Sequence, residues 1–439
     1  MVGKMDDGKR NPHDEFFQVK KGNPTLVPPA VDNNQGRVYF LSNVDDDLTI
    51  IHTLYCFKSG GQEAGEVIKN ALSKVLVHYY PLAGRLILSP EGGFAVNCTG
   101  EGVVFIEAEA DCGLDDVDFS KPDKATRGKL AAFDVPGVGN KFEIPLMAQV
   151  TKFKCGGFVL GISFNHVLAD GQAAAEFIVS WAETARGLPI SVPPFLDRTI
   201  LKARTPPKIE FHHSEFEPIE DKSSAINDFS NEEIMAYKYL KFTPQMIQTA
   251  KSKTTGLTKP CSTYEALSAF TWRARTRALN TAPDQLTRIL LVVNTRGRFE
   301  PPLPKGYFGN AIKFTPAHSL AAELIQEPVS HAVVKIREAV RSVNDRVLRS
   351  TIDYCEATRA KRPRGYSTMT ATTWSSLSFS ATDFGWGEPI LSEPVEIPSD
   401  DTVVFLSHPT EKGSFNVFLA LPISAMEKFE DIVQEELCN

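Results

Sequence analysis

The sequence has few cysteines, and those it has show no pairing pattern. Its seven cysteines are scattered over 439 residues, and no two are spaced as C-x-x-C. An odd number without such a spacing argues against a disulfide framework and against a structural zinc site. The adjacent His212 and His213 lie in a segment rich in proline and glutamate, where we expect both side chains to be exposed. We therefore expect no metal ion and no permanently bound cofactor.

Long apolar runs and a surplus of positive charge are also missing. No stretch reaches the roughly 18 consecutive apolar residues of a membrane helix, and residues 1–22 are polar, unlike a secretory signal. Lys and Arg total 47 against 54 Asp and Glu, a formal net charge of −7, whereas a protein that binds a nucleic-acid backbone needs excess cations. We expect a soluble cytoplasmic monomer that binds no nucleic acid and is not an integral membrane protein.

What is present is the composition of a large globular protein, with 42% hydrophobic and 23% charged residues. The chain is longer than a usual domain of about 50–250 residues, so two domains are expected. Both halves mix strand-like and helical periodicity, which predicts an α/β fold. A segment rich in proline and charge, residues 189–226, separates residues 1–188 from residues 227–439 and is predicted to be an interdomain crossover.

The predicted elements are spread along the whole chain. Strands are expected at residues 37–42, 51–57, 86–88, 93–97, 146–154, 157–165, 288–294, 367–375, 403–406 and 414–421. Helices are expected at residues 62–78, 172–186, 262–278, 322–344 and 424–436. Strand 157–165 is almost wholly apolar at its centre, which predicts burial on both faces.

His166 directly follows that buried strand, and it is the only histidine with an aspartate four residues later, Asp170. A neutral imidazole at a strand end can accept a proton from an alcohol or amine that attacks a carbonyl; the alternative is a core histidine with satisfied nitrogens. Asp170 either orients the imidazole, as in a hydrolytic triad, or pairs with an arginine and braces the turn. The strand lacks the second glycine of G-x-S-x-G, so a covalent serine mechanism is unsupported.

A second motif, D-F-G-W-G at Asp383–Gly387, stands near the C-terminal end of the sequence. By itself it predicts a loop in which two glycines adopt unusual backbone angles and a tryptophan packs inward. The first three letters occur in protein kinases, but no kinase glycine-rich loop, V-A-I-K or H-R-D pattern accompanies them.

Together the two motifs resemble the signature pair of the plant BAHD acyl-CoA-dependent acyltransferases. Four further segments carry the resemblance, namely Tyr79–Arg85, Ser262–Ala269, Asn294–Arg298 and Gly306–Asn310. The resemblance implies two chloramphenicol-acetyltransferase-like mixed-sheet sandwich domains with a channel between them, and part of residues 370–395 packed with the N-terminal domain. It also implies acyl-CoA as a co-substrate and direct acyl transfer without an acyl-enzyme or a metal.

The resemblance also implies roles for the residues of the site. His166 becomes the general base, and Asp170 a structural residue paired with Arg296, or failing that Arg298. Trp374 and Thr373 match positions beside the reacting carbonyl.

The resemblance assigns two segments to the CoA site or its support. Ser262 begins a helix whose N–H groups favour a CoA phosphate. By the same resemblance, Asp383, Gly385 and Trp386 belong to the CoA site or support it.

Within the family, three segments resemble hydroxycinnamoyl transferases that act on long-chain alcohols of suberin and cutin: Pro194–Leu201, Phe153–Gly161 and Ala357–Pro363. The expected reaction is transfer of a feruloyl-type group from CoA to an ω-hydroxy fatty acid or fatty alcohol. Alternatives are N-acylation of spermidine-like polyamines, transfer to shikimate or quinate, and a catalytically silent acyl-CoA-binding protein.

Shikimate-type relatives place T-x-S-x-Y near the first strand, where this sequence has Gln35, Arg37 and Tyr39, and an arginine before a motif that is absent here. Arg359 lies in the same general region. A polyhydroxylated acidic acceptor is therefore disfavoured.

Overall fold

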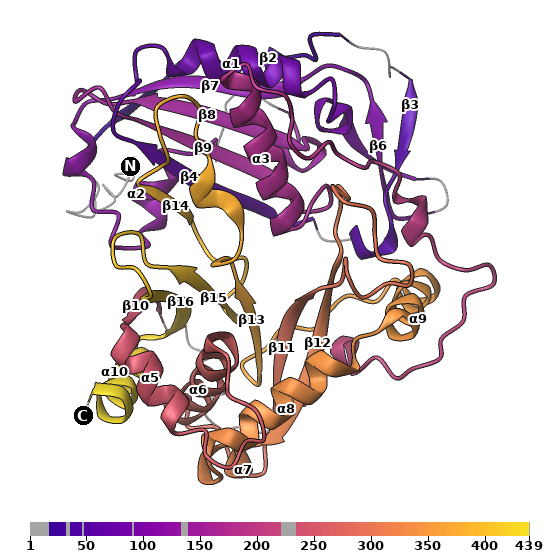
Figure 1. Ribbon diagram of the computed structural model, residues 1–439, viewed down its shortest axis with the longest axis vertical. Helices are drawn as coiled ribbons and strands as arrows, with labels where there is room; N and C mark the ends of the chain where they lie inside the picture. Colours follow the sequence, from indigo (N-terminus) through magenta and orange to yellow (C-terminus); the bar gives the residue numbers. More distant parts are fainter. Residues whose placement is uncertain are drawn as a thin grey trace, which may run out of the picture.

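A computed structural model describes residues 17–31, 36–45, 48–89, 92–132, 139–220 and 234–438. The described chain builds one seven-stranded and one six-stranded mixed sheet, with a smaller three-stranded sheet beside the first (Figure 1). Within the described residues, no helix is both long enough and apolar enough to cross a membrane.

The seven-stranded sheet positions the start of the candidate site. It contains β1 (Val19–Lys21), β2 (Thr25–Val27), β4 (Ile50–Phe57), β7 (Val103–Ala110), β8 (Leu146–Lys152), β9 (Phe158–Asn165) and β14 (Leu391–Pro394). Strand β9 pairs antiparallel with both β4 and β8, and every one of its residues is buried, as its apolar sequence predicts. The three-stranded sheet is the predicted hairpin of β5 (Arg85–Leu88) and β6 (Phe94–Cys98), joined by β3 (Arg37–Phe40).

Helices α1 (Ala64–Val75) and α3 (Gly171–Ala185) cover one face of this sheet (Figure 1). Helix α3 buries Phe177, Ile178 and Trp181, and the Trp181 Nε1–H group donates a 2.9 Å hydrogen bond to a carbonyl of α1. Gly187 lies just past its end with φ of 71°, a left-handed conformation that glycine adopts without strain. The short helix α2 (Lys124–Gly128) lies between β7 and β8 in the chain.

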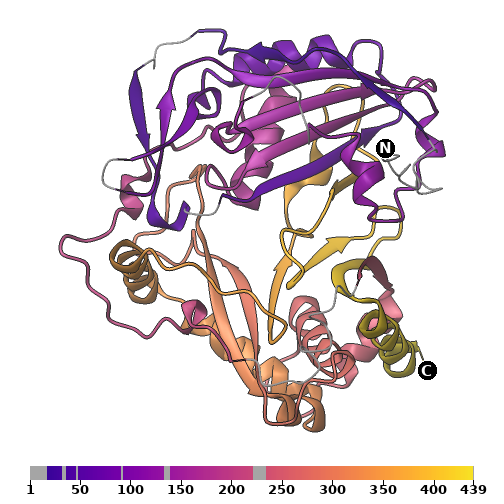
Figure 2. The same cartoon turned by 180° about the vertical axis from the view of Figure 1, so that it is seen from behind.

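The six-stranded sheet belongs to the second half of the chain and is also mixed. Its strands are β10 (Met235–Phe242), β11 (Leu286–Asn294), β12 (Ile312–Leu320), β13 (Thr368–Thr373), β15 (Thr402–Ser407) and β16 (Phe415–Pro422). Its helices are α5 (Pro244–Ser252), α6 (Thr263–Ala278), α7 (Ala321–Gln326), α8 (Val329–Ser342), α9 (Asp345–Thr358) and α10 (Ile423–Val433). Helices α5, α6, α8 and α10 pack with one face of the sheet in the largest apolar core of the described chain (Figure 2).

The single helix predicted at residues 322–344 was wrong, because the structure has two helices there, α7 and α8. Pro328 lies between them. Proline has no N–H for the helical ladder, and it pushes the preceding residue, Glu327, out of the helical region, to ψ of 158°. The chain therefore turns at Pro328 and starts again.

The composition of the predicted crossover suggested an exposed connection, but part of this segment is buried. From residue 189 to 220 it runs along the outside of the molecule (Figure 1). The expectation that His213 is exposed was wrong: it is 3% exposed, and its ring nitrogens contact Glu215 (3.1 Å) and Ser350 (2.9 Å). Glu215 also pairs with Lys313 of β12, so buried ionic contacts fix the crossover to the second half. His212 is exposed, as expected. The domain boundaries at residues 188 and 226 stay predictions.

Strand β14 returns from the second half of the chain to pair antiparallel with β4 of the first. A buried arginine holds this return. Arg127, on α2, is 1% exposed and forms a 2.9 Å ion pair with Glu393 of β14. Its guanidinium also donates to the Pro394 carbonyl (2.9 Å) and to the Tyr239 hydroxyl of β10 (2.8 Å). One side chain thus joins elements of both large sheets.

We expect Glu393→Ala to lower the free energy of unfolding by about 3–5 kcal/mol, because Arg127 would keep a buried charge without its carboxylate. Denaturant unfolding measures this change. The matched control is Glu430→Ala, which removes the half-exposed pair of Glu430 with Lys238 and is expected to cost less than about 1 kcal/mol. Equal losses in the two variants would contradict the role given to Arg127.

Candidate active site

A cavity of about 1220 Å³ is lined by both halves of the chain. Residues of β4, β9 and α3 supply the wall on the side of the first sheet, and residues of β11, β12, β13, α8 and α9 supply the other. Single small-molecule sites usually have volumes of about 300–1,000 Å³. The cavity therefore has room for parts of two substrates at once.

His166 lines this cavity at the point where β9 ends. Its backbone N–H donates to the Thr49 carbonyl (2.8 Å), which extends the β4–β9 pairing by one step. Its carbonyl accepts a 2.7 Å bond from the side chain of Asn310. The imidazole Nδ1 is buried and has no hydrogen-bond partner among the described residues. No carboxylate therefore orients this ring in the manner of a hydrolytic triad.

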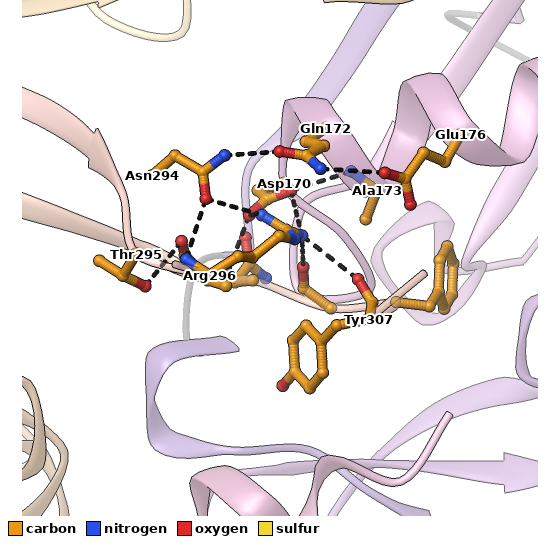
Figure 3. Close-up of polar contacts among 12 residues, drawn as sticks. Asp170, Gln172, Ala173, Glu176, Asn294, Thr295, Arg296 and Tyr307 are labelled. Atoms are coloured by element: carbon orange, nitrogen blue, oxygen red, sulfur yellow. Dashed lines mark hydrogen bonds and ion pairs between the residues drawn. The ribbon is translucent and has the colours of Figure 1, made fainter. Parts of the chain in front are cut away.

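Both carboxylate oxygens of Asp170 accept hydrogen bonds from donors other than the imidazole, and Figure 3 shows those of Arg296 and Ala173. Asp170 caps α3 by accepting a 3.0 Å bond from the Ala173 N–H, and it accepts a 2.8 Å bond from the Ala311 N–H. Each of its two oxygens also accepts a hydrogen bond from one terminal nitrogen of Arg296, at 2.8 and 2.9 Å. Burial alone would raise the pKa of Asp170, but Arg296 and the two N–H groups outweigh it and hold the pKa below its usual range.

Arg296 comes from the loop after β11, so its ion pair with Asp170 joins the two halves of the chain. The same guanidinium donates to the carbonyls of Tyr307 (3.3 Å) and Gly309 (3.0 Å), which fixes its fork in one orientation. Arg298, the other arginine considered, donates instead to carbonyls at the end of α8. The structure thus brings Asp170 together with Arg296 and keeps Arg298 apart.

Thr373 and Trp374 line the same cavity at the end of β13. The Thr373 hydroxyl lies 2.8 Å from the Ser375 hydroxyl and 3.3 Å from the Phe405 carbonyl. A hydroxyl has one proton to donate, so these neighbours compete with any substrate for it. The Trp374 ring is half-buried and packs against Phe379 with centroids 5.4 Å apart.

Ser262 also lines the cavity, as the residue that caps the start of α6. Its hydroxyl accepts from the Glu265 N–H (3.2 Å), and the Glu265 carboxylate accepts from the Ser262 N–H (2.8 Å), a reciprocal capping box. Arg337 pairs with that carboxylate at 2.7 Å. The helix start therefore already holds an acidic side chain, and Arg337 brings a cation beside it.

The D-F-G-W-G motif forms a loop that does not line the cavity. Asp383 folds the loop on itself by accepting from the N–H groups of Gly385 (2.7 Å) and Gly387 (2.9 Å), both glycines with positive φ. Its second oxygen lies 3.5 Å from Arg186, at the end of α3. Trp386 packs edge-on against Phe158 of β9. In the described structure the motif braces α3 and β9, and Asp383, Gly385 and Trp386 are absent from the cavity lining.

The residues compared above with shikimate-type relatives lie in different parts of the described structure. Arg37 is exposed on β3, and the Tyr39 hydroxyl donates a 2.7 Å bond to the Leu196 carbonyl; neither lines the cavity. Arg359 does line it, and its guanidinium donates to the Asn43 side chain. Gln35 lies outside the described residues.

The cavity carries the opposite charge balance to the whole chain. Its described lining contains nine arginines and lysines but only five carboxylates, although the chain has a net charge of −7. The cations are Arg296, Arg298, Lys313, Arg337, Arg341, Arg359, Lys361, Arg362 and Arg364. The carboxylates are Asp170, Glu176, Glu215, Glu265 and Asp401. An excess of cations in a concave site favours anionic ligands.

Sequence reasoning missed three buried polar residues around the His166 turn. Arg198 lies in the predicted crossover, Asp45 precedes β4, and Asn310 precedes β12. Arg198 and Asp45 form a fully buried ion pair of 3.1 Å. The available signal for two of them was the arginine among the apolar residues of Pro194–Leu201 and the asparagine of Gly306–Asn310, both segments of the family resemblance. Asp45 stands in a run of three aspartates, residues 45–47, and had no such signal.

Comparison with known proteins adds to this geometry. A family model described as the Transferase family matches residues 17–436. An omega-hydroxypalmitate O-feruloyl transferase of Arabidopsis thaliana is 53% identical over 426 residues, which are 94% of this chain and 92% of that protein. A fatty alcohol:caffeoyl-CoA acyltransferase of the same plant is 49% identical over 422 residues, which are 94% of this chain and 98% of that protein.

The fold also has a counterpart among solved structures. Vinorine synthase superposes with a TM-score of 0.77 at 20% identity, over 96% of this chain and 98% of that one. This likeness confirms the two-domain, chloramphenicol-acetyltransferase-like α/β architecture. With the family model covering nearly the whole chain, the protein belongs to the Transferase family, the BAHD acyl-CoA-dependent acyltransferases that its His-x-x-x-Asp and D-F-G-W-G motifs resemble.

Proposed function

We propose that the protein transfers a hydroxycinnamoyl group of the feruloyl type from its CoA thioester to the hydroxyl of an ω-hydroxy fatty acid or fatty alcohol. The observation that carries this proposal is the placement of His166 in a cavity large enough for two substrates. The names of the relatives at 53% and 49% identity, a feruloyl transferase for omega-hydroxypalmitate and a caffeoyl-CoA transferase for fatty alcohols, support the choice of substrates.

His166 acts as the general base. Because Nδ1 is buried, Nε2 is the nitrogen that takes the proton from the acceptor hydroxyl. The hydroxyl oxygen attacks the thioester carbonyl and forms a tetrahedral oxyanion. The C–S bond then breaks, the acyl group stays on the acceptor oxygen, and the CoA thiolate recovers the proton from the imidazolium. No acyl-enzyme forms in this sequence.

Trp374 is the proposed donor to the oxyanion, through its indole N–H in the cavity wall. A donor held by the fold costs no reorganisation when the negative charge develops. Thr373 lies beside it, but its single proton is contested by the Phe405 carbonyl and the Ser375 hydroxyl. We therefore give Thr373 the lesser role of orienting the substrate.

The CoA phosphates are proposed to lie where Ser262 begins α6 and Arg337 faces the cavity. Asp383, Gly385 and Trp386 support the site at a distance, since their loop contacts the end of α3 and the face of β9.

The acceptor tail is proposed to lie along the apolar part of the cavity. Both walls supply large apolar side chains: Ile51, Ile162, Phe164 and Ile178 from the first half, and Leu290, Val292, Ile312, Phe314, Ile336 and Val340 from the second. A polyamine acceptor would carry several positive charges into a lining that is already rich in cations. This charge balance argues for the aliphatic acceptor over the polyamine.

We expect His166→Ala to lower kcat by about 10²–10⁴-fold, the usual cost of removing a general base, with little change in the affinity for acyl-CoA. Steady-state kinetics and CoA binding by calorimetry measure both quantities. The matched control is His212→Ala, which changes an exposed histidine outside the cavity and is expected to leave kcat unchanged. A folded His166→Ala enzyme with near-normal kcat would exclude the mechanism.

We expect Asp170→Asn to lower the free energy of unfolding by about 3–5 kcal/mol at neutral pH, because Arg296 would lose its buried partner. The exposed Asp115→Asn is the control, with an expected change below about 0.5 kcal/mol. A collapse of kcat without any loss of stability would instead place Asp170 in the proton transfer.

The pH dependence of that stability difference follows from the lowered pKa of Asp170. As the pH falls, the unfolded chain takes up a proton at this carboxyl near its ordinary pKa of about 3.9, whereas the folded protein takes it up only at a lower pH. The stabilisation is therefore complete above about pH 5 and is lost as the pH falls toward the lower folded pKa. The difference between wild type and Asp170→Asn should be constant above about pH 5 and shrink below about pH 4.

For the acceptor, we expect kcat/KM to rise with chain length across a series of ω-hydroxy acids and primary alcohols. Each buried methylene contributes about 0.8 kcal/mol, or up to about fourfold, until the apolar wall is filled. Spermidine, shikimate and quinate serve as comparison acceptors with one feruloyl-CoA donor. The highest efficiency with spermidine would indicate an N-acyltransferase, and the highest efficiency with shikimate would show that the cavity recognises acidic polyols.

A further inference from the structure

The turn that carries His166 is held by side chains from distant parts of the chain. Between β9 and α3, the His166 carbonyl accepts from Asn310 (2.7 Å), and the Val167 carbonyl accepts from Arg198 (3.1 Å). The Leu168 carbonyl accepts from the other terminal nitrogen of Arg198. Three successive carbonyls of the turn are thus each bound by a donor that lies at least 30 residues away in the sequence.

Arg198 is itself fixed on every side. It is 1% exposed, its guanidinium pairs with Asp45 at 3.1 Å, and its Nε–H donates to the Phe308 carbonyl at 3.0 Å. The rings of Tyr39 and Phe308 lie 5.2 and 5.7 Å from the guanidinium carbon. Burial opposes the charged form of Arg198, but the Asp45 carboxylate and the hydroxyls of Tyr39 and Tyr307 together outweigh it and raise the pKa further above its usual value. The guanidinium is therefore a charged, rigid fork under the turn.

Asn310 uses both protons of its amide group. One N–H lies 2.7 Å from the His166 carbonyl, and the Asp45 carboxylate accepts at 2.9 Å from the same nitrogen and at 3.0 Å from the Asn310 backbone N–H. The next residue, Ala311, donates its backbone N–H to Asp170. Two consecutive residues of the second half thus hold the first and the last residue of the His166–Asp170 turn.

The glycine before Asn310 allows this close approach. A Cβ atom at Gly309 would come within 2.9 Å of the Arg198 Nε. Since the Gly309 carbonyl also accepts from Arg296, this one segment connects the two arginines that serve the turn. The packing accounts for the final Gly-Asn of the Gly306–Asn310 segment.

We propose that Asn310, together with the Arg198–Asp45 pair beneath it, positions the imidazole of His166 for proton transfer. This inference rests on the proposed function and makes Asn310 a positioning residue, since it acts on the backbone of His166 and not on substrate. A side chain cannot be placed more accurately than the backbone that carries it, and displacement by about 1 Å from a reactive geometry can cost about 10²-fold in rate.

The test is Asn310→Ala in the full-length enzyme, with kcat, KM and melting temperature measured together. We expect kcat to fall by about 10- to 100-fold while KM for acyl-CoA stays within about twofold. The matched control is Gln149→Ala, which removes a fully buried amide that donates at 2.9 Å to the Lys129 carbonyl and to Thr151, outside the cavity lining. It should lower the melting temperature but keep kcat.

The same substitution in a His166→Ala background separates positioning from general destabilisation. If Asn310 acts through the imidazole, the double variant retains the residual activity of His166→Ala within about twofold. A further drop of tenfold would show that Asn310 acts elsewhere. Where Asn310→Ala does not accumulate as folded protein, Asn310→Leu, which keeps a side chain of similar size but has no donor, is measured against the same criteria.

The outcomes distinguish the two levels of the proposal. Unchanged kcat in a folded Asn310→Ala or Asn310→Leu enzyme, with His166→Ala inactive, overturns the positioning role and leaves the proposed function in place. Full activity of His166→Ala overturns the general-base mechanism itself, and the positioning role with it.

Discussion

The ion pair between Asp170 and Arg296 is the contact on which the arrangement of the site depends. It joins the first turn of α3, in one half of the chain, to the loop after β11 in the other, and both residues line the cavity between the sheets. Because Asp170 also caps α3 and accepts from the Ala311 N–H, a single carboxylate sets the start of the helix and its distance from the second sheet. An aspartate used in this way has no free oxygen to serve the imidazole.

The same solution occurs at two other junctions of the fold. Arg198 with Asp45, and Arg127 with Glu393, are buried pairs in which the guanidinium also serves backbone carbonyls. Arginine suits this task because its five donors are fixed in one plane and its charge persists when buried. Elements from distant parts of the sequence are therefore held in place by directional contacts in addition to apolar packing.

The cavity between the elements that these ion pairs hold in place suits both anionic and apolar substrates. The chain is acidic overall, yet the described lining is rich in cations, and much of the remaining wall is aliphatic or aromatic. Cations attract the phosphates of a CoA thioester, and the apolar wall accepts an alkyl chain that offers no other handle for recognition. The two properties together suit a donor that is highly charged and an acceptor that is mostly hydrocarbon.

The sequence alone determined those parts of the protein whose signal is local. Strand β9 and helix α3 follow from apolar periodicity and a terminal glycine, His166 stands out by its aspartate at the fourth position, and the motifs identify the family.

Tertiary structure decided what depends on distant partners. Strand β12 was missed because it buries Lys313, Thr315 and Ser319 and so lacks the apolar alternation of a typical strand. His213 was placed at the surface although Glu215 and Ser350 enclose it. The role proposed for Asn310 depends on its contacts with His166 and Asp45, which lie 144 and 265 residues away in the sequence. No local sequence pattern encodes which buried polar groups will meet. Only the folded chain therefore brings these groups within hydrogen-bond distance.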